Sequence, residues 1–427
     1  MTADLLDLVT AATPAESVDV LVTWVGGVTI ARYRMAIARR HIHSPLERRA
    51  SFLVSVLAVL LLVRGVAWLR PDIRVLGTLM IAPAALLPMA MTIFVEGLLR
   101  RHVPRAMKWL ALGATSAALG ADVLTYATQS DDRWASGILL GALVVTMTAL
   151  TVLLARRDTA SLSRSENGLV RACLVVALVG LPLLVTDFRF VLGAPPARLG
   201  TLSALLFCYT LLRPTQERGR LVRWVIDVAR LVWRAALACT LLLVALRTAP
   251  RELFFPLGVL ATTLVMSLAI HDRISHLRVH GANPGILRWL ARPPVASMEE
   301  FQRELRHLTL TADALVVTSK DLTAYNQDAL RGALAGRDRA HTLAEVTRDR
   351  ALGASERGAL AMRGSDELSD LLERARMTHV VLLCRDPLSM LLANVPELPG
   401  HEDASIALAA IARRAPTTAR SAHAGSA

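Results

Sequence analysis

The sequence lacks the short motifs that mark the common enzyme classes. It holds no GxSxG nucleophile motif, no phosphate-binding GxxxxGK[ST] loop, no HExxH zinc motif and no set of protein-kinase loops. The C-terminal part, residues 297–415, has no cluster of His, Asp and Glu at catalytic spacing. These absences favour a protein without catalytic chemistry. They leave open only an active site assembled from residues far apart in the chain.

Cysteine is scarce as well. The four cysteines are Cys173, Cys208, Cys239 and Cys384. No two of them have the spacing of a metal site or of a redox CxxC pair. Three lie in apolar runs and one in an expected strand, where cysteine behaves as a small apolar side chain. We therefore predict no metal site and no cofactor.

Basic residues are in excess, but only in the first 298 residues. Residues 1–298 carry 32 Lys and Arg against 17 Asp and Glu, whereas residues 299–427 carry 16 against 18. The basic residues fall in short segments between apolar runs, which is the positive-inside pattern of membrane proteins. A nucleic-acid-binding protein gathers them on one folded surface instead, so we predict no nucleic-acid partner.

Long apolar runs dominate the chain, with 54% hydrophobic residues and a mean hydropathy of +0.45. The clearest run, Val75–Leu99, is as long as the ~20 residues that a helix needs to cross a bilayer. Arg100 and Arg101 follow it directly and mark a cytoplasmic end. Pro83 and Pro88 lie inside the run and predict a kink.

The alternation of apolar runs predicts a polytopic α-helical membrane bundle of about nine spans. We place them at 18–33, 50–69, 75–99, 106–127, 134–155, 172–186, 199–212, 221–246 and 253–270, the sixth broken by Pro182. The arginine-rich loops then put the N-terminus outside and the C-terminus in the cytoplasm, across a bacterial inner membrane. If the weak first run only lies in the interface, there are eight spans and the N-terminus moves inside.

The chain divides into four parts. Residues 1–278 form the membrane domain, 279–296 a linker, 297–415 a small cytosolic α/β domain, and 416–427 a disordered tail. In the α/β domain we expect strands at 313–320, 380–384 and 390–395, the last two as a hairpin, and helices at 321–334, 365–376 and 404–414. Ser297 with Glu300, and Thr342 with Glu345, have the spacing of capping boxes.

Three ionisable residues inside the spans are candidate ligand-binding residues. Arg64 and Asp122 each lie five residues before the outer end of a span, which places both ~7–8 Å inside the boundary. Opposite charges at one depth can pair and form an outward-facing polar pocket, or each can reach the interface separately. Glu96 either pairs with Arg100 one turn later or serves as a proton or ligand group at the inner mouth of the bundle.

A second set of arginines predicts contact with lipid headgroups. Arg220, Arg223, Arg230 and Arg234 recur with Asp227 every three to four residues, on one face of a helix. We expect this face to lie at the cytoplasmic interface and to bind anionic headgroups. The bilayer is therefore the first predicted partner.

Residues 57–220 resemble the multi-span sensor modules at the N-termini of bacterial histidine kinases. The likeness is carried by LLPMAMTIFVEGLLRRHVPRAMKWL, an apolar helix with an aromatic residue near its inner end and then a basic turn. The chain departs from that family further on, because it has neither a phospho-accepting His box nor a glycine-rich ATP lid. The resemblance implies a sensor whose output domain is not a kinase.

These observations favour an integral membrane sensory or signalling protein that couples an external or membrane cue to a non-catalytic, partner-binding cytosolic domain. Prolines and charges within the spans keep a transporter or permease open. Arginine-rich inner loops, which could hold phosphate, keep open a membrane enzyme acting on lipid-linked substrates. A cytosolic protein partner is expected, and a homo-oligomer remains open.

Overall fold

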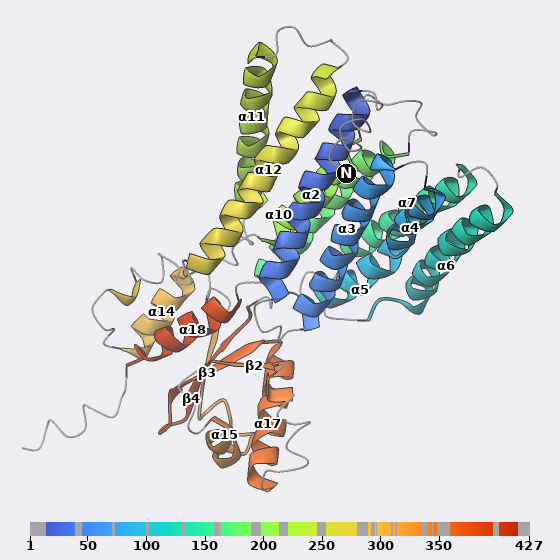
Figure 1. Ribbon diagram of the computed structural model, residues 1–427. Coiled ribbons are helices and arrows are strands. Elements are labelled where there is room, and N and C mark those ends of the chain that lie inside the picture. The colour runs from blue at the N-terminus through green and yellow to red at the C-terminus, as the bar shows by residue number, and fades with distance from the viewer. Residues whose placement is uncertain are drawn as a thin grey trace, which may run out of the picture.

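A computed structural model gives the arrangement of the chain (Figure 1). It describes residues 14–416 apart from 39–44, 71–72, 100–101, 130–132, 158–161, 163, 189–197, 213–220, 246–252, 280–288, 292–294, 296, 309–310, 312–313, 335–339, 344, 348–358 and 396–400. The predicted tail therefore lies almost wholly outside the described residues, as do most of the predicted linker and Arg100.

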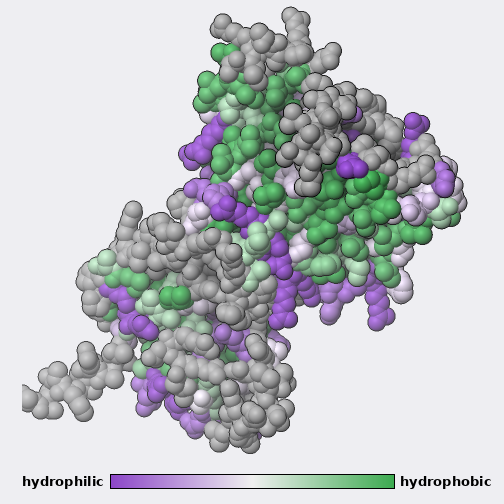
Figure 2. All heavy atoms as spheres, viewed as in Figure 1, coloured by the Kyte–Doolittle hydropathy of each residue, from purple (hydrophilic) through white to green (hydrophobic). Residues whose placement is uncertain are grey.

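The N-terminal part is a bundle of long helices. These are α2 (Pro14–Ala38), α3 (Pro45–Leu69), α4 (Arg74–Ala85), α5 (Leu87–Leu99), α6 (Arg105–Thr128), α7 (Arg133–Ala155), α8 (Arg164–Val185), α10 (Gly200–Leu211), α11 (Leu221–Ala245) and α12 (Phe254–Val279). Among the described residues, seven helical segments are long and apolar enough to cross a membrane, with α4 and α5 together forming one of them. Apolar side chains cover much of the visible bundle surface (Figure 2). The chain is thus a multi-pass membrane protein, and crossing by the short α10 and by α11 stays a prediction.

The first helix, α2, is longer than its weak apolar run suggested and packs inside the bundle. It contacts α3, α10 and α12, so helices cover it on several sides. A Cβ atom on Gly26 would collide with the Thr201 side chain, so glycine permits this close approach of α2 and α10. Such packing fits a bundle helix and not one lying in the interface.

Pro83 and Pro88 flank an interruption of their helix, whereas Pro182 lies inside a continuous helix. The predicted kink in 75–99 is confirmed: the helix breaks at Leu86, between Pro83 and Pro88, into α4 and α5. The predicted break at Pro182 is wrong, because α8 runs through it to Val185. α8 also begins at Arg164, eight residues before the expected start at Ala172, and Glu166 in its first turn lies 3.5 Å from Asn394 of the C-terminal domain.

The C-terminal domain contains a four-stranded antiparallel sheet in the order β1-β4-β3-β2. The strands are β1 (Leu315–Thr318), β2 (His341–Thr342), β3 (His379–Cys384) and β4 (Ser389–Ala393). The main helices are α14 (Met298–His307), α15 (Gln327–Leu334), α17 (Ala359–Ala375) and α18 (His401–Ala412). The predicted β3–β4 hairpin is confirmed, but the two-residue strand β2 was missed and the helix expected from residue 321 begins at Gln327.

Both faces of the sheet are covered. On the central strand β4, Leu391 and Ala393 pack with Phe301 of α14, while Met390 and Leu392 pack with Leu372 of α17. This alternation follows the two-residue period of a strand. The domain is therefore three-layered, with α14 and α18 on one side and α15 and α17 on the other.

Both residue pairs that were predicted as capping boxes form hydrogen bonds in the structure. Thr342 and Glu345 exchange backbone-to-side-chain hydrogen bonds of 3.1 Å each, which is the reciprocal capping box. Ser297 accepts a 3.2 Å hydrogen bond from the backbone N–H of Glu300. The domain core begins earlier than predicted, because Trp289 of the expected linker is buried against Phe301.

Candidate functional site

Five helices of the bundle line a cavity that is partly open to the outside of the bundle. The helices α3, α5, α7, α8 and α10 follow one another around it, each packed against the next and α10 against α3. The cavity has a volume of about 140 Å³. A volume of this order admits a small apolar ligand such as benzene.

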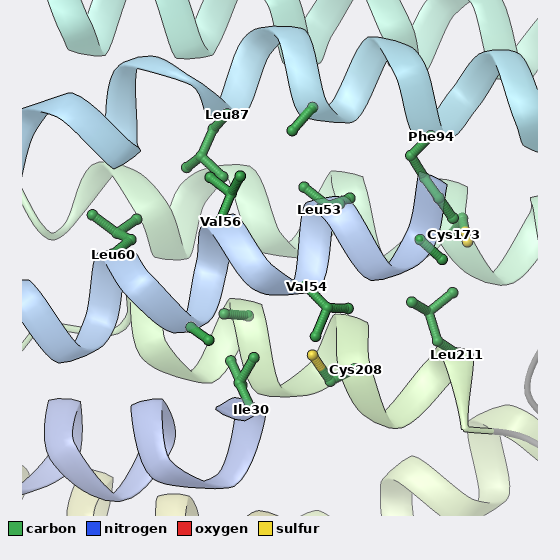
Figure 3. Close-up of a cluster of buried hydrophobic side chains, with 14 of the residues drawn as sticks. Ile30, Leu53, Val54, Val56, Leu60, Leu87, Phe94, Cys173, Cys208 and Leu211 are labelled. Carbon is green, nitrogen blue, oxygen red and sulfur yellow. The ribbon is translucent and has the colours of Figure 1, made fainter. Parts of the chain in front are cut away.

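The walls of the cavity are apolar. Most lining residues are apolar: Leu53, Leu57, Leu60 and Leu61 of α3, Leu87, Met91, Phe94 and Val95 of α5, Met147, Leu150 and Leu154 of α7, Cys173, Val176, Ala177 and Leu184 of α8, and Ala204 and Phe207 of α10. Thr151 of α7 and Ser203 of α10 also line the cavity. In Figure 3, Leu87 and Phe94 point toward α3. On α3 the lining reaches from Leu53 to Arg64, about 16 Å at 1.5 Å per residue. The cavity is therefore elongated along the helices.

An ion pair closes the end of the cavity that lies away from the C-terminal domain. Nη1 of Arg64 on α3 lies 2.5 Å from Oδ2 of Asp187, just beyond the end of α8, and both residues line the cavity. Their side chains are only 9% and 7% exposed. A buried charge needs a partner, and here each supplies the other.

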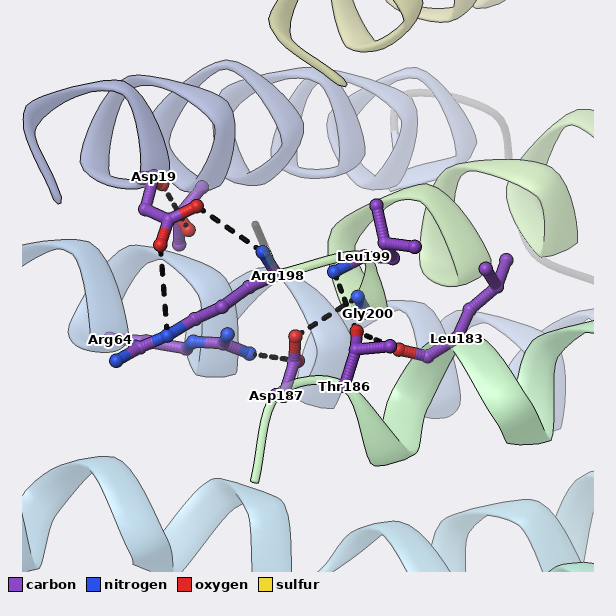
Figure 4. Close-up of polar contacts among 9 residues, drawn as sticks. Asp19, Arg64, Leu183, Thr186, Asp187, Arg198, Leu199 and Gly200 are labelled. Atoms are coloured by element: carbon purple, nitrogen blue, oxygen red, sulfur yellow. Dashed lines mark hydrogen bonds and ion pairs between the residues drawn. The ribbon is translucent and has the colours of Figure 1, made fainter. Parts of the chain in front are cut away.

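Asp187 and its neighbour Thr186 accept hydrogen bonds from the start of α10, and these bonds hold Asp187 in place (Figure 4). Its second carboxylate oxygen accepts a 3.0 Å hydrogen bond from the backbone N–H of Gly200, the first residue of α10. The Thr186 hydroxyl accepts one of 2.9 Å from the N–H of Leu199. These acceptors satisfy N–H groups that a helix start leaves free. A Cβ on Gly200 would collide with the Asp187 carboxylate, so glycine is required here.

A second acid–base pair lies beside the first, across an indole ring. The guanidinium carbons of Arg64 and Arg198 lie 4.2 Å and 3.7 Å from the Trp68 ring centroid. Arg198 also lies 3.8 Å from the Asp19 carboxylate of α2, which accepts its backbone N–H. Two guanidinium groups and two carboxylates thus meet beside the Trp68 ring.

The hydrogen bonds of this network do not satisfy every buried donor. Nη2 of Arg64 is buried and makes no hydrogen bond within the described part of the chain. Leaving a buried donor unsatisfied is costly, and more so for a charged group.

The predicted pairing of Arg64 with Asp122 is wrong. Asp122 is buried on α6, which packs mainly against α4, α5 and α7, and Arg64 pairs with Asp187. The equal depths of Arg64 and Asp122 made Asp122 a plausible partner. Depth alone, however, does not show which helices are neighbours. Asp187 was missed because it falls just past an apolar run, in a segment that we assigned to an external loop.

Glu96 lies toward the end of the cavity opposite Arg64; it follows the lining residue Val95 but does not itself line the cavity. Its carboxylate accepts a 2.8 Å bond from Lys108 and lies 2.9 Å from Nδ1 of His102. Arg100, its predicted partner, lies outside the described residues. The geometry joins the end of α5 to the start of α6 and does not bring Glu96 to Arg64.

The arginines of α11 separate into different settings. Arg230 and Arg234 are exposed, as predicted. Asp227 lies between two arginines, 3.9 Å from Arg230 on the same helix and 3.7 Å from Arg273 of α12. Arg220 and the side chain of Arg223 lie outside the described residues.

The start of α8 lies beside the C-terminal domain. Glu166 in its first turn is buried, and its carboxylate is 3.5 Å from the side-chain amide of Asn394, which follows β4. The same amide donates to the backbone carbonyl of Arg376 at 3.2 Å. One helix thus reaches from the C-terminal domain, along the cavity wall, to Asp187.

Within the described ranges, no three or more His, Cys, Asp or Glu side chains gather as metal ligands. No protein-family model, no curated protein and no solved structure matches this chain.

Proposed function

We propose that the protein is a membrane sensory protein whose bundle binds a ligand in the cavity and whose C-terminal domain relays the bound state to a cytosolic partner. The observation that carries this proposal is the course of α8. Its residues Cys173 to Leu184 line the cavity, Asp187 follows its end, and Glu166 at its start lies beside Asn394. A ligand that moves α8 has a direct mechanical route to the domain.

The proposed setting is a bacterial inner membrane, with the C-terminal domain in the cytoplasm. Basic residues at the bundle end next to this domain support that orientation; they include the exposed Arg105 and Arg171. The exposed Arg230 and Arg234 flank the exposed Trp233 on α11, a composition suited to anionic headgroups at an interface. On this assignment the polar end of the cavity belongs to the outer half of the bundle.

Hydrogen exchange tests the coupling. The protein in lipid nanodiscs would be compared with and without benzene, a small apolar molecule of a size that the cavity admits. We expect altered exchange in α8 and around Asn394. The change should vanish in Ala177→Phe, which fills the cavity from α8, and persist in Val179→Phe, a same-helix control at an exposed site. Occupancy of the cavity without any change in the C-terminal domain would refute the proposal.

A transporter is the second candidate. The observation that favours it is the helix break at Leu86, because Leu87 beside the break lines the cavity. Broken helices at a central site are typical of transporters. Flux of a cavity ligand across sealed vesicles, absent in Ala177→Phe, would support transport.

A further inference from the structure

We propose that the cavity binds a small uncharged aromatic molecule, with a single ring and no long chain. This inference rests on the proposed function, because it names the ligand class of that same site. It is drawn from the volume of the cavity, its mainly apolar lining, and the aromatic and thioether side chains in its wall.

The volume of the cavity limits the size of the ligand. At about 140 Å³ it is close to that of an apolar protein cavity that takes up benzene or xenon. A molecule of about one ring fits this space, whereas the whole chain of a membrane lipid does not. Because the cavity is partly open to the outside of the bundle, a small molecule dissolved around the bundle can reach it.

The lining disfavours a charged ligand. Four lining residues, Arg64, Thr151, Asp187 and Ser203, carry polar side chains, and the two charged ones bond to each other. Along the rest of the cavity a charged group would lose its water and find only apolar side chains, which is expensive. An uncharged apolar molecule meets no such cost.

Two phenylalanines in the wall favour an aromatic ring over an aliphatic one. Phe94 of α5 and Phe207 of α10 both line the cavity, and their rings pack edge to face, with centroids 5.5 Å apart and planes at 85°. Aromatic rings in this geometry gain free energy beyond the area that they bury. An aromatic ligand can make the same kind of contact with either ring, whereas an aliphatic ring of similar size gains only from burial.

Two methionines add to this preference. Met91 of α5 and Met147 of α7 line the cavity from different helices. Their thioether sulfurs make favourable contacts with aromatic rings, and their unbranched side chains adapt to the shape of a ligand. Met91 and Phe94 are three residues apart, so α5 presents both on one face of the helix.

Methyl NMR of the full-length protein tests the ligand class without requiring any response of the C-terminal domain. The protein in lipid nanodiscs would carry isotope-labelled methionine methyl groups, each assigned by substitution with Leu, and would be titrated with benzene. The ring current of benzene shifts nearby methyl signals, so we expect the Met91 and Met147 signals to shift and to saturate. Met89, exposed on the same helix as Met91, is the control for benzene that is only dissolved around the bundle, and its signal should not saturate.

Competition then measures the preference for an aromatic ring. Cyclohexane should displace benzene only at about two- to tenfold higher thermodynamic activity than benzene itself needs for half-saturation. Phe94→Leu and Phe207→Leu, which keep an apolar side chain, should each reduce this difference. Octylbenzene should bind more weakly than benzene at equal activity, and benzoate should give no saturable shift. Ala177→Phe should abolish the saturable shift, and Val179→Phe should leave it unchanged.

The ligand class would be overturned if Met91 failed to saturate, as expected for Met89, or if cyclohexane, octylbenzene or benzoate bound at least as well as benzene. A preference for benzene that both leucine variants leave unchanged would overturn the role of the two rings. A saturable benzene shift while hydrogen exchange in the C-terminal domain stays unchanged would refute the sensory function and keep the ligand class. An exchange response that cyclohexane elicits as well as benzene would do the reverse.

Discussion

Arg64 and Asp187 are 123 residues apart in the sequence and form a buried ion pair across the end of one cavity. Their contact joins α3 to the segment between α8 and α10. Among the described residues, Arg64 and Asp187 are the only charged residues that line that cavity. The pair therefore links the architecture of the bundle to its candidate binding site.

The first prediction concerns this pair. Arg64→Met strands a carboxylate and Asp187→Leu strands a guanidinium, so each should lower thermal stability in detergent. The double change removes both charges and should be milder than the two effects added, with a coupling of about 1 kcal/mol or more. Arg64→Met combined with Asp122→Asn is the matched control, and this pair should be additive to within about 0.5 kcal/mol. Coupling in the control and additivity in the test pair would contradict the observed partner.

The sequence predicted most helices because apolar runs of membrane length have few other structures available to them. It also predicted the β3–β4 hairpin and the reciprocal contact of Thr342 with Glu345, which are signals local in the chain. It could not identify Asp187 as the partner of Arg64, since that depends on which helices are neighbours. The two-residue strand β2 was too short to show a period.

A second prediction contrasts two helical glycines. A Cβ on Gly65 of α3 would lie 2.8 Å from two atoms of the Trp24 indole, whereas one on Gly77 of α4 would meet nothing within 4 Å. Gly65→Ala should therefore destabilise the bundle by about 1–3 kcal/mol through overpacking. Gly77→Ala should be neutral or stabilise it by up to about 1 kcal/mol through helix propensity. Thermal melts in one detergent measure both, and an equal effect of the two changes would contradict the close approach of α2 and α3.

A third prediction concerns orientation. The helix α6 runs from Arg105, on the side of the C-terminal domain, to Thr128 at the opposite side. Alkaline phosphatase, which is active only outside the cytoplasm, should be active when fused after Gln129 and inactive when fused after Pro416. A green fluorescent protein fusion at each site should give the opposite pattern. Activity of the phosphatase at Pro416 would reverse the proposed topology.

The last prediction concerns where the C-terminal domain begins. Trp289 lies in the segment that the sequence assigned to a linker, yet it is buried against Phe301 at a ring-centroid distance of 6.2 Å. Its indole N–H donates a 2.6 Å hydrogen bond to Glu304, and its carbonyl accepts one of 2.5 Å from Arg414. Trp289 thus ties α14 to the residues that follow α18, which the sheet alone does not do.

A fragment of residues 286–416 should therefore fold on its own and melt cooperatively, as followed by circular dichroism. Removing the indole by Trp289→Ala should lower its stability by about 3–5 kcal/mol, the usual cost of deleting a buried aromatic side chain. Trp289→Phe is the milder control, because it keeps most of the apolar contact and loses the hydrogen bond to Glu304. A shorter fragment, 297–416, should resemble the alanine variant. If the two fragments melt alike, the contacts of Trp289 add nothing to the domain and its boundary returns to residue 297.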